Sequence, residues 1–190
     1  HCQGKYPGDE AYRPLYKKAA ELDTPVFIHA APSMVGHEFL TRDKLTTKFL
    51  RLFGRDIDHT LAVIRLIGSG ILKDFPNLKF IHGHIGGTWF VFSDRFLEPL
   101  HPLWNNTEET KKYLGQMYFD IASAGWKQSH IDCATDTIGA DKLLFGSDVP
   151  ATPANTMEIN RKLVEGLKIS KKDKGKILSD NAMKLFKIKG

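Results

Sequence analysis

Short apolar runs alternate with longer amphipathic segments along this chain. Four apolar runs predict strands buried on both faces, at residues 25–29, 78–84, 117–121 and 142–145. The amphipathic segments predict helices over residues 9–22, 58–74, 107–114, 126–138 and 156–167, with further helices from Trp89 and from Ser170 to Phe186. Because each strand is followed by helix, the chain is predicted to be α/β, with parallel strands in an open sheet or a closed barrel.

Two helix starts carry capping residues. Asp58 is expected to cap the helix that ends at Asp74, and Ser170 with Asp173 resembles a capping box. Residues 30–57 contain Pro32, Gly36 and Gly54, and they predict a long loop that carries some helix.

Side chains that can bind metal or move protons occur at all four strand ends. His29 ends the first strand and His84 the second, Asp120 lies in the third, and Asp148 follows the fourth. In parallel βα folds the ligand site gathers at these carboxyl ends. A single buried His is more often a satisfied core residue, but several on one face are harder to explain as packing, since unpaired buried polar groups are costly.

His82 has the same strand parity as His84, because side chains alternate faces with a period of two. If His84 points into a barrel, His82 lies one layer below it, with Ile81 facing the helices. We therefore expect His82 to pack behind the site and support it, without binding a ligand directly.

Composition narrows the class of protein. The 190 residues suffice for one domain but fall short of the ~250 of a complete eight-stranded barrel. The net charge is +5, and part of the excess lies in the lysines of residues 168–176, which we interpret as a solvated helix surface, so no nucleic-acid partner is expected. Two cysteines without a CxxC favour a reducing compartment and a cytoplasmic location. No apolar run approaches the ~20 residues of a membrane span.

Four motifs together resemble the amidohydrolase-related family (amidohydrolase 2). They are VFIH at 26–29, FPNLKFIHGHIGG at 75–87, LFGSDVP at 144–150, and DNA at 180–182 before Leu185-Phe186. Their order and spacing are similar to the branch that contains aminocarboxymuconate-semialdehyde decarboxylase and the resorcylate decarboxylases. The resemblance implies a (β/α)8 TIM barrel of the metal-dependent hydrolase type, with residues 1–190 as the C-terminal portion of this single domain.

The resemblance also implies roles for individual residues. His29 looks like the family's metal-binding His, and Asp148 like the Asp that binds the metal and shuttles a proton. His84 looks like the catalytic His that activates metal-bound water. Arg95 is similar to an Arg that holds the substrate carboxylate, although a surface position on a helix explains it equally well. The resemblance implies one divalent metal ion, with Zn favoured over Mn and Fe. Because dimers are common in the family, a homodimer is possible on the same ground.

One part of the family pattern is absent from this sequence. The family's His-x-His or Glu-x-His pair on the first barrel strand has no counterpart before His29, so roughly three βα units are expected to lie outside these residues. As a whole, the resemblance implies an enzyme that hydrolyses or non-oxidatively decarboxylates a small carboxylate-bearing molecule. The alternatives are a metal-independent lactonase-like hydrolase, and an inactive barrel fragment that serves as an interaction module.

Overall fold

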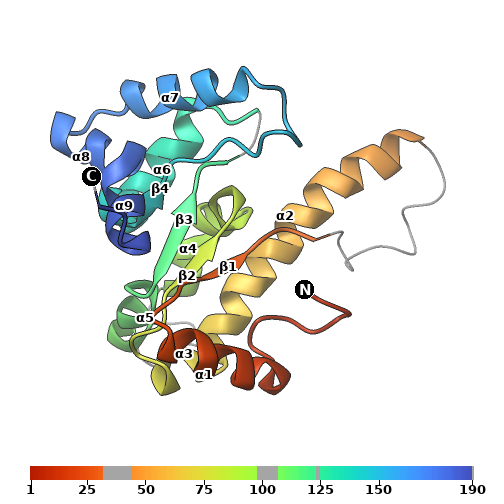
Figure 1. Ribbon diagram of the computed structural model, residues 1–190. Helices are drawn as coiled ribbons and strands as arrows, with labels where there is room; N and C mark the ends of the chain where they lie inside the picture. Colours follow the sequence, from red (N-terminus) through yellow and green to blue (C-terminus); the bar gives the residue numbers. More distant parts are fainter. Residues whose placement is uncertain (32–43, 98–106, 123–124, 190) are drawn as a thin grey trace.

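The computed structural model describes residues 1–31, 44–97, 107–122 and 125–189 (Figure 1). Four parallel strands form a sheet in the order β1-β2-β3-β4. The strands are short and confirm the four predicted runs: β1 (Val26–Ile28), β2 (Phe80–His82), β3 (Met117–Asp120) and β4 (Leu143–Leu144). Chain neighbours are therefore sheet neighbours, as in consecutive βα units.

Helices connect the strands, and the predicted helices have counterparts. They are η1 (Glu10–Tyr12), α1 (Arg13–Glu21), α2 (Lys44–Gly68), α3 (Ile71–Asp74), η3 (His84–Gly86), α4 (Trp89–Leu97), α5 (Thr107–Leu114), α6 (Gln128–Ile138), η4 (Ala140–Lys142), α7 (Thr156–Gly166), α8 (Lys171–Gly175), the π-helix η5 (Lys176–Asp180) and α9 (Asn181–Phe186). The predicted cap at Ser170 is confirmed, because its hydroxyl accepts a hydrogen bond from the Asp173 amide at 3.1 Å. None of the described helices is long and apolar enough to cross a membrane.

The predicted helix start at Asp58 is wrong. Helix α2 begins at Lys44, so Asp58 lies inside it, buried, where its carboxylate accepts a hydrogen bond from the Tyr6 hydroxyl. Gly54 favoured a loop, yet it lies within the helix, where a single glycine costs only about 1 kcal/mol. The helix ends at Gly68, and Gly70 takes a left-handed conformation (φ 78°) before α3. The rest of the predicted loop includes residues 32–43, outside the described part.

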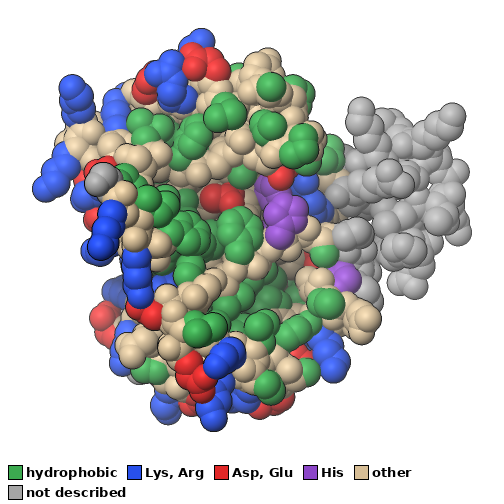
Figure 2. Space-filling view, viewed as in Figure 1, with side chains coloured by type: hydrophobic (Ala, Val, Ile, Leu, Met, Phe, Trp, Pro, Cys, Tyr) green, Lys and Arg blue, Asp and Glu red, His purple; other side chains and the backbone are tan. Residues whose placement is uncertain are grey.

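Helices cover one face of the sheet. Phe80 of β2 packs edge-on against Tyr16 of α1 with ring centroids 5.3 Å apart, and Phe119 of β3 packs against Phe90 of α4 at 4.8 Å. On the opposite face, Phe27 of β1 is 51% exposed. In Figure 2 this face is hollowed at its centre, with hydrophobic side chains in the hollow and acidic and histidine side chains beside them. In the described residues, helices thus cover one face of the sheet and leave the opposite face open.

His82 lies on the helix-covered face, which contradicts the predicted parity. Its ring lies 5.7 Å from that of His59 on α2 and stacks on Phe119 at 5.3 Å. The alternation fails because β2 ends at His82, and the chain turns at His84, whose φ is +52°. His84 therefore reaches the end of the sheet although it has the parity of a helix-facing residue.

Candidate active site

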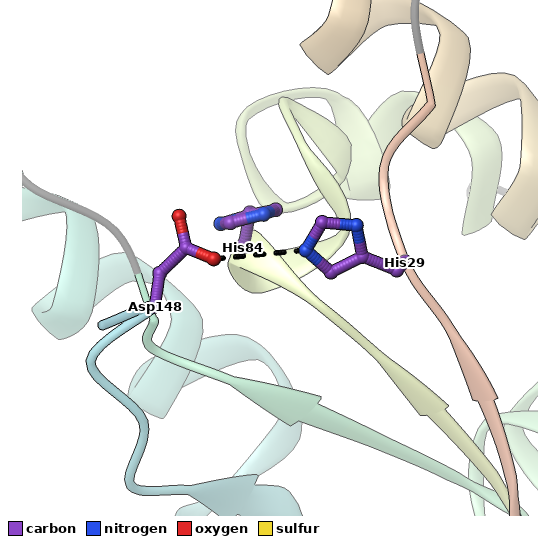
Figure 3. A group of neighbouring side chains, drawn as sticks. All are labelled: His29, His84 and Asp148. Carbon is purple, nitrogen blue, oxygen red and sulfur yellow. Dashed lines mark ion pairs between the residues drawn. The ribbon is translucent and has the colours of Figure 1, made fainter. Parts of the chain in front are cut away.

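Three predicted residues meet at the carboxyl end of the sheet (Figure 3). His29 follows β1, His84 follows β2, and Asp148 lies four residues beyond β4. One ligand atom from each lies within 4.8 Å of the others, and His29 Nε2 lies 3.6 Å from Asp148 Oδ1. The side chains point toward one another in Figure 3 although they come from segments more than 50 residues apart. The fold therefore assembles one cluster from three strand ends.

A backbone carbonyl fixes the tautomer of His29. Its Nδ1 lies 2.9 Å from the carbonyl oxygen of Ala30. Because a carbonyl only accepts, Nδ1 must carry the hydrogen in this bond. In the neutral ring, Nε2 then presents a lone pair toward Asp148. The His29 side chain is 60% exposed, so the cluster is open to solvent on this side.

His84 is buried, with 1% of its surface exposed, and two hydrogen bonds hold it in place. Its Nδ1 donates to the carbonyl oxygen of Ala122 at 2.8 Å, and its backbone amide donates to Asp120 Oδ1 at 2.9 Å. Its Nε2 is buried and has no hydrogen-bond partner among the described residues. The ring thus presents a second lone pair, without a partner, at the cluster.

Asp120 positions this turn and is not part of the metal-capable cluster. Its Oδ1 accepts from the amides of His84 and Ala122, each at 2.9 Å. Burial raises the pKa of Asp120, while these two amides act in the opposite direction. The sequence predicted Asp120 as an acidic residue at a strand end. No sequence pattern indicated that two backbone amides would donate hydrogen bonds to its carboxylate.

The donor set suits a divalent transition metal ion. Two neutral imidazole nitrogens and a carboxylate oxygen are good ligands for Zn, Mn and Fe. Three acceptors that face one another without a hydrogen between them repel, so a cation or a proton stabilises the arrangement. The residues present therefore fit the ion that the sequence motifs implied.

Two other predicted residues lie apart from the cluster. Arg95 is in the last turn of α4, exposed, and forms no ion pair with any described residue. His82 lies behind the sheet against α2. A substrate role for Arg95 and a supporting role for His82 stay predictions.

Known proteins resemble this chain over nearly all of its length. A family model described as "Amidohydrolase" matches residues 1–188. The 6-methylsalicylic acid decarboxylase of Penicillium expansum is 28% identical over 97% of this chain and 57% of its own length. The 2-keto-4-carboxy-3-hexenedioate hydratase of a Sphingobium species is 25% identical over 94% of this chain and 50% of its own length. The chain thus spans about half the length of the curated relatives it matches.

A solved structure shows the same fold. The dihydroxybenzoic acid decarboxylase of Polaromonas sp. JS666, solved with bound manganese and the inhibitor 2-nitroresorcinol, superposes with a TM-score of 0.77. It is 23% identical, and the match covers 96% of this chain and 55% of that one. The four βα units described above are therefore part of a TIM barrel. The matched residues, the motifs and the fold agree: the chain belongs to the amidohydrolase family.

Proposed function

We propose that this protein is a metal-dependent decarboxylase of small hydroxylated aromatic carboxylates. The observation that carries the proposal is the convergence of His29, His84 and Asp148 within 4.8 Å, with the buried Nε2 of His84 unpartnered. A 6-methylsalicylic acid decarboxylase among the relatives and a dihydroxybenzoic acid decarboxylase among the solved structures support this substrate class.

Each residue has a distinct task in the proposed reaction. His29 Nε2 and Asp148 would hold the ion, which supplies Lewis-acid polarisation of substrate oxygens. His84 Nε2 is an acceptor in the tautomer that the Ala122 carbonyl favours, and it would take a hydrogen bond from water or a substrate hydroxyl. When the bond between ring carbon and carboxylate breaks, carbon dioxide leaves and the electron pair stays on the ring. Asp148, after taking a proton from water, would deliver the replacing proton to that carbon and return to its carboxylate form.

Manganese in the Polaromonas structure supports manganese as the ion, and the same donors accept Zn or Fe. Arg95, exposed in the last turn of α4, would bind the substrate carboxylate. A cytoplasmic location and a homodimer are part of the same proposal.

The test measures carbon dioxide released from 6-methylsalicylate and 2,6-dihydroxybenzoate by the full natural chain loaded with manganese. We expect turnover by the parent and its loss in His84→Asn and Asp148→Asn. His130→Asn is the matched control, because His130 is exposed on α6 and outside the cluster. No carbon dioxide from either acid would refute the decarboxylase, and addition of water to 2-keto-4-carboxy-3-hexenedioate would identify a hydratase instead.

A further inference from the structure

The turn that carries His84 has an unusual backbone. Four consecutive residues, His84, Ile85, Gly86 and Gly87, have positive φ values of 52°, 57°, 66° and 73°. Glycine adopts this region freely, but a residue with a Cβ loses about 1–2 kcal/mol there. Such conformations persist only where the surroundings impose them. Something outside the turn must therefore hold His84 and Ile85 in place.

One hydroxyl group on helix α2 forms hydrogen bonds to this turn. Thr60, 7% exposed, has its Oγ1 2.9 Å from both the backbone amide and the hydroxyl of Thr88 and 3.3 Å from the carbonyl oxygen of Gly86. The same oxygen lies 2.9 Å from the carbonyl of Asp56, one helical turn earlier. The Thr88 amide donates to this oxygen, and the single hydroxyl hydrogen is left for one of the acceptors. Thr60 thus binds the turn on both sides of Gly87.

The backbone of α2 also contacts the turn directly. A Cβ placed on Gly87 would lie 2.0 Å from the Asp56 carbonyl oxygen, so helix and turn touch without an intervening side chain. On the other side of the turn, Asp120 and Ala122 hold His84 itself. The turn is therefore fixed between β3 and α2, and only the α2 side depends on a hydroxyl.

We propose that Thr60 is a positioning residue for His84. By tying Gly86 and Thr88 to α2, it keeps the left-handed turn in the one conformation that aims His84 Nε2 at His29 and Asp148. Nothing in Thr60 touches the cluster, so it acts only through the turn. The kinetic consequence rests on the proposed function, whereas the structural consequence for His84 does not.

The kinetic test replaces the hydroxyl by a methyl group of the same shape. Thr60→Val should lower kcat about tenfold or more with KM within about twofold of the parent, since a small misplacement of a reacting group is costly. Thr60→Ser keeps the hydroxyl and should restore most of kcat. Thr135→Val on α6 is the matched control, because Thr135 is 8% exposed and its hydroxyl also donates to the carbonyl four residues earlier, at 2.7 Å. Equal effects of Thr60→Val and Thr135→Val would overturn the proposal.

A second measurement needs no substrate. In ¹⁵N-labelled protein, the ring signals of His84 should move in Thr60→Val and stay in place in Thr135→Val. If Thr60→Val does not fold, Thr88→Ala takes its place and should move the same signals. An unchanged His84 signal in the folded variant contradicts the proposal, whether or not the parent decarboxylates anything. An inactive parent with a displaced His84 signal would instead refute the proposed function and leave the positioning role standing.

Discussion

His84 and His29 both turn Nε2 toward the cluster, because a backbone carbonyl accepts a hydrogen bond from Nδ1 of each ring. The carbonyls of Ala122 and Ala30 accept from Nδ1 of the two rings, which leaves Nε2 of each ring as the free donor of a lone pair. This arrangement is how metal-binding and proton-accepting histidines are commonly oriented in proteins. The chemistry of the cluster therefore depends on backbone groups that no sequence motif specifies.

Asp120 offers the most direct test at the residue scale. Asp120→Ala removes the acceptor of two amides and should lower the free energy of unfolding by about 2–4 kcal/mol, since each buried amide left unsatisfied costs about 1–3 kcal/mol. Asp120→Asn keeps the side-chain oxygen and should cost clearly less. Urea denaturation of the two variants measures the difference. Equal losses would mean that the carboxylate charge, and not the two hydrogen bonds, supports the turn.

At the scale of elements, the contact between α2 and the His84 turn is close enough to exclude a methyl group. Gly87→Ala would force a Cβ against the Asp56 carbonyl and should lower the free energy of unfolding by about 3 kcal/mol or more, from backbone strain and overpacking together. Gly70→Ala is the control for the positive φ, because Gly70 has a φ of +78° and nothing within 4 Å of its Cβ position, although its ψ of −10° differs from the −121° of Gly87.

The control should lose only about 1–2 kcal/mol, the cost of the left-handed backbone alone. Chemical denaturation of both variants gives the comparison. If Gly87→Ala is no less stable than Gly70→Ala, then α2 does not press on the turn as described.

The sequence predicted the strands and their functional ends better than it predicted what surrounds them. The apolar runs located β1 to β4, and the side chains after them included His29, His84 and Asp148. The period-two rule misplaced His82 because it holds only within a strand, and β2 ends at that residue. Asp58 was misread as a cap because nothing local shows that the Tyr6 hydroxyl, 52 residues away, would use it. Local patterns therefore place elements, while long-range hydrogen bonds decide the roles of polar residues.

At the scale of the whole molecule, buried neutral histidines link folding to pH. Burial lowers the pKa of His82 to about 3 and that of His59 well below its ordinary value. The four ring nitrogens of this pair have no hydrogen-bond partner among the described residues. In the unfolded chain both rings titrate near pH 6.5, so the unfolded state binds more protons below that pH.

Stability should therefore be complete above about pH 6.5 and fall as the pH decreases toward the folded-state pKa values. Each ring contributes about 1.4 kcal/mol per pH unit below 6.5, so the pair should cost roughly 4 kcal/mol between pH 6.5 and pH 5. Urea denaturation at pH 7.5 and pH 5, with a chelator present throughout, measures this. The variant carrying His59→Leu and His82→Leu should show a much smaller difference, and an undiminished difference would assign the acid sensitivity to other groups.

The central claim is that His29 and Asp148 hold one divalent metal ion beside His84, and metal content tests it most directly. Inductively coupled plasma mass spectrometry of the full natural chain should find about one Mn, Zn or Fe per protein, lost in His29→Ala and Asp148→Asn and retained in the exposed control His130→Ala. A folded parent that takes up no transition metal, even when manganese or zinc is supplied, would contradict the account.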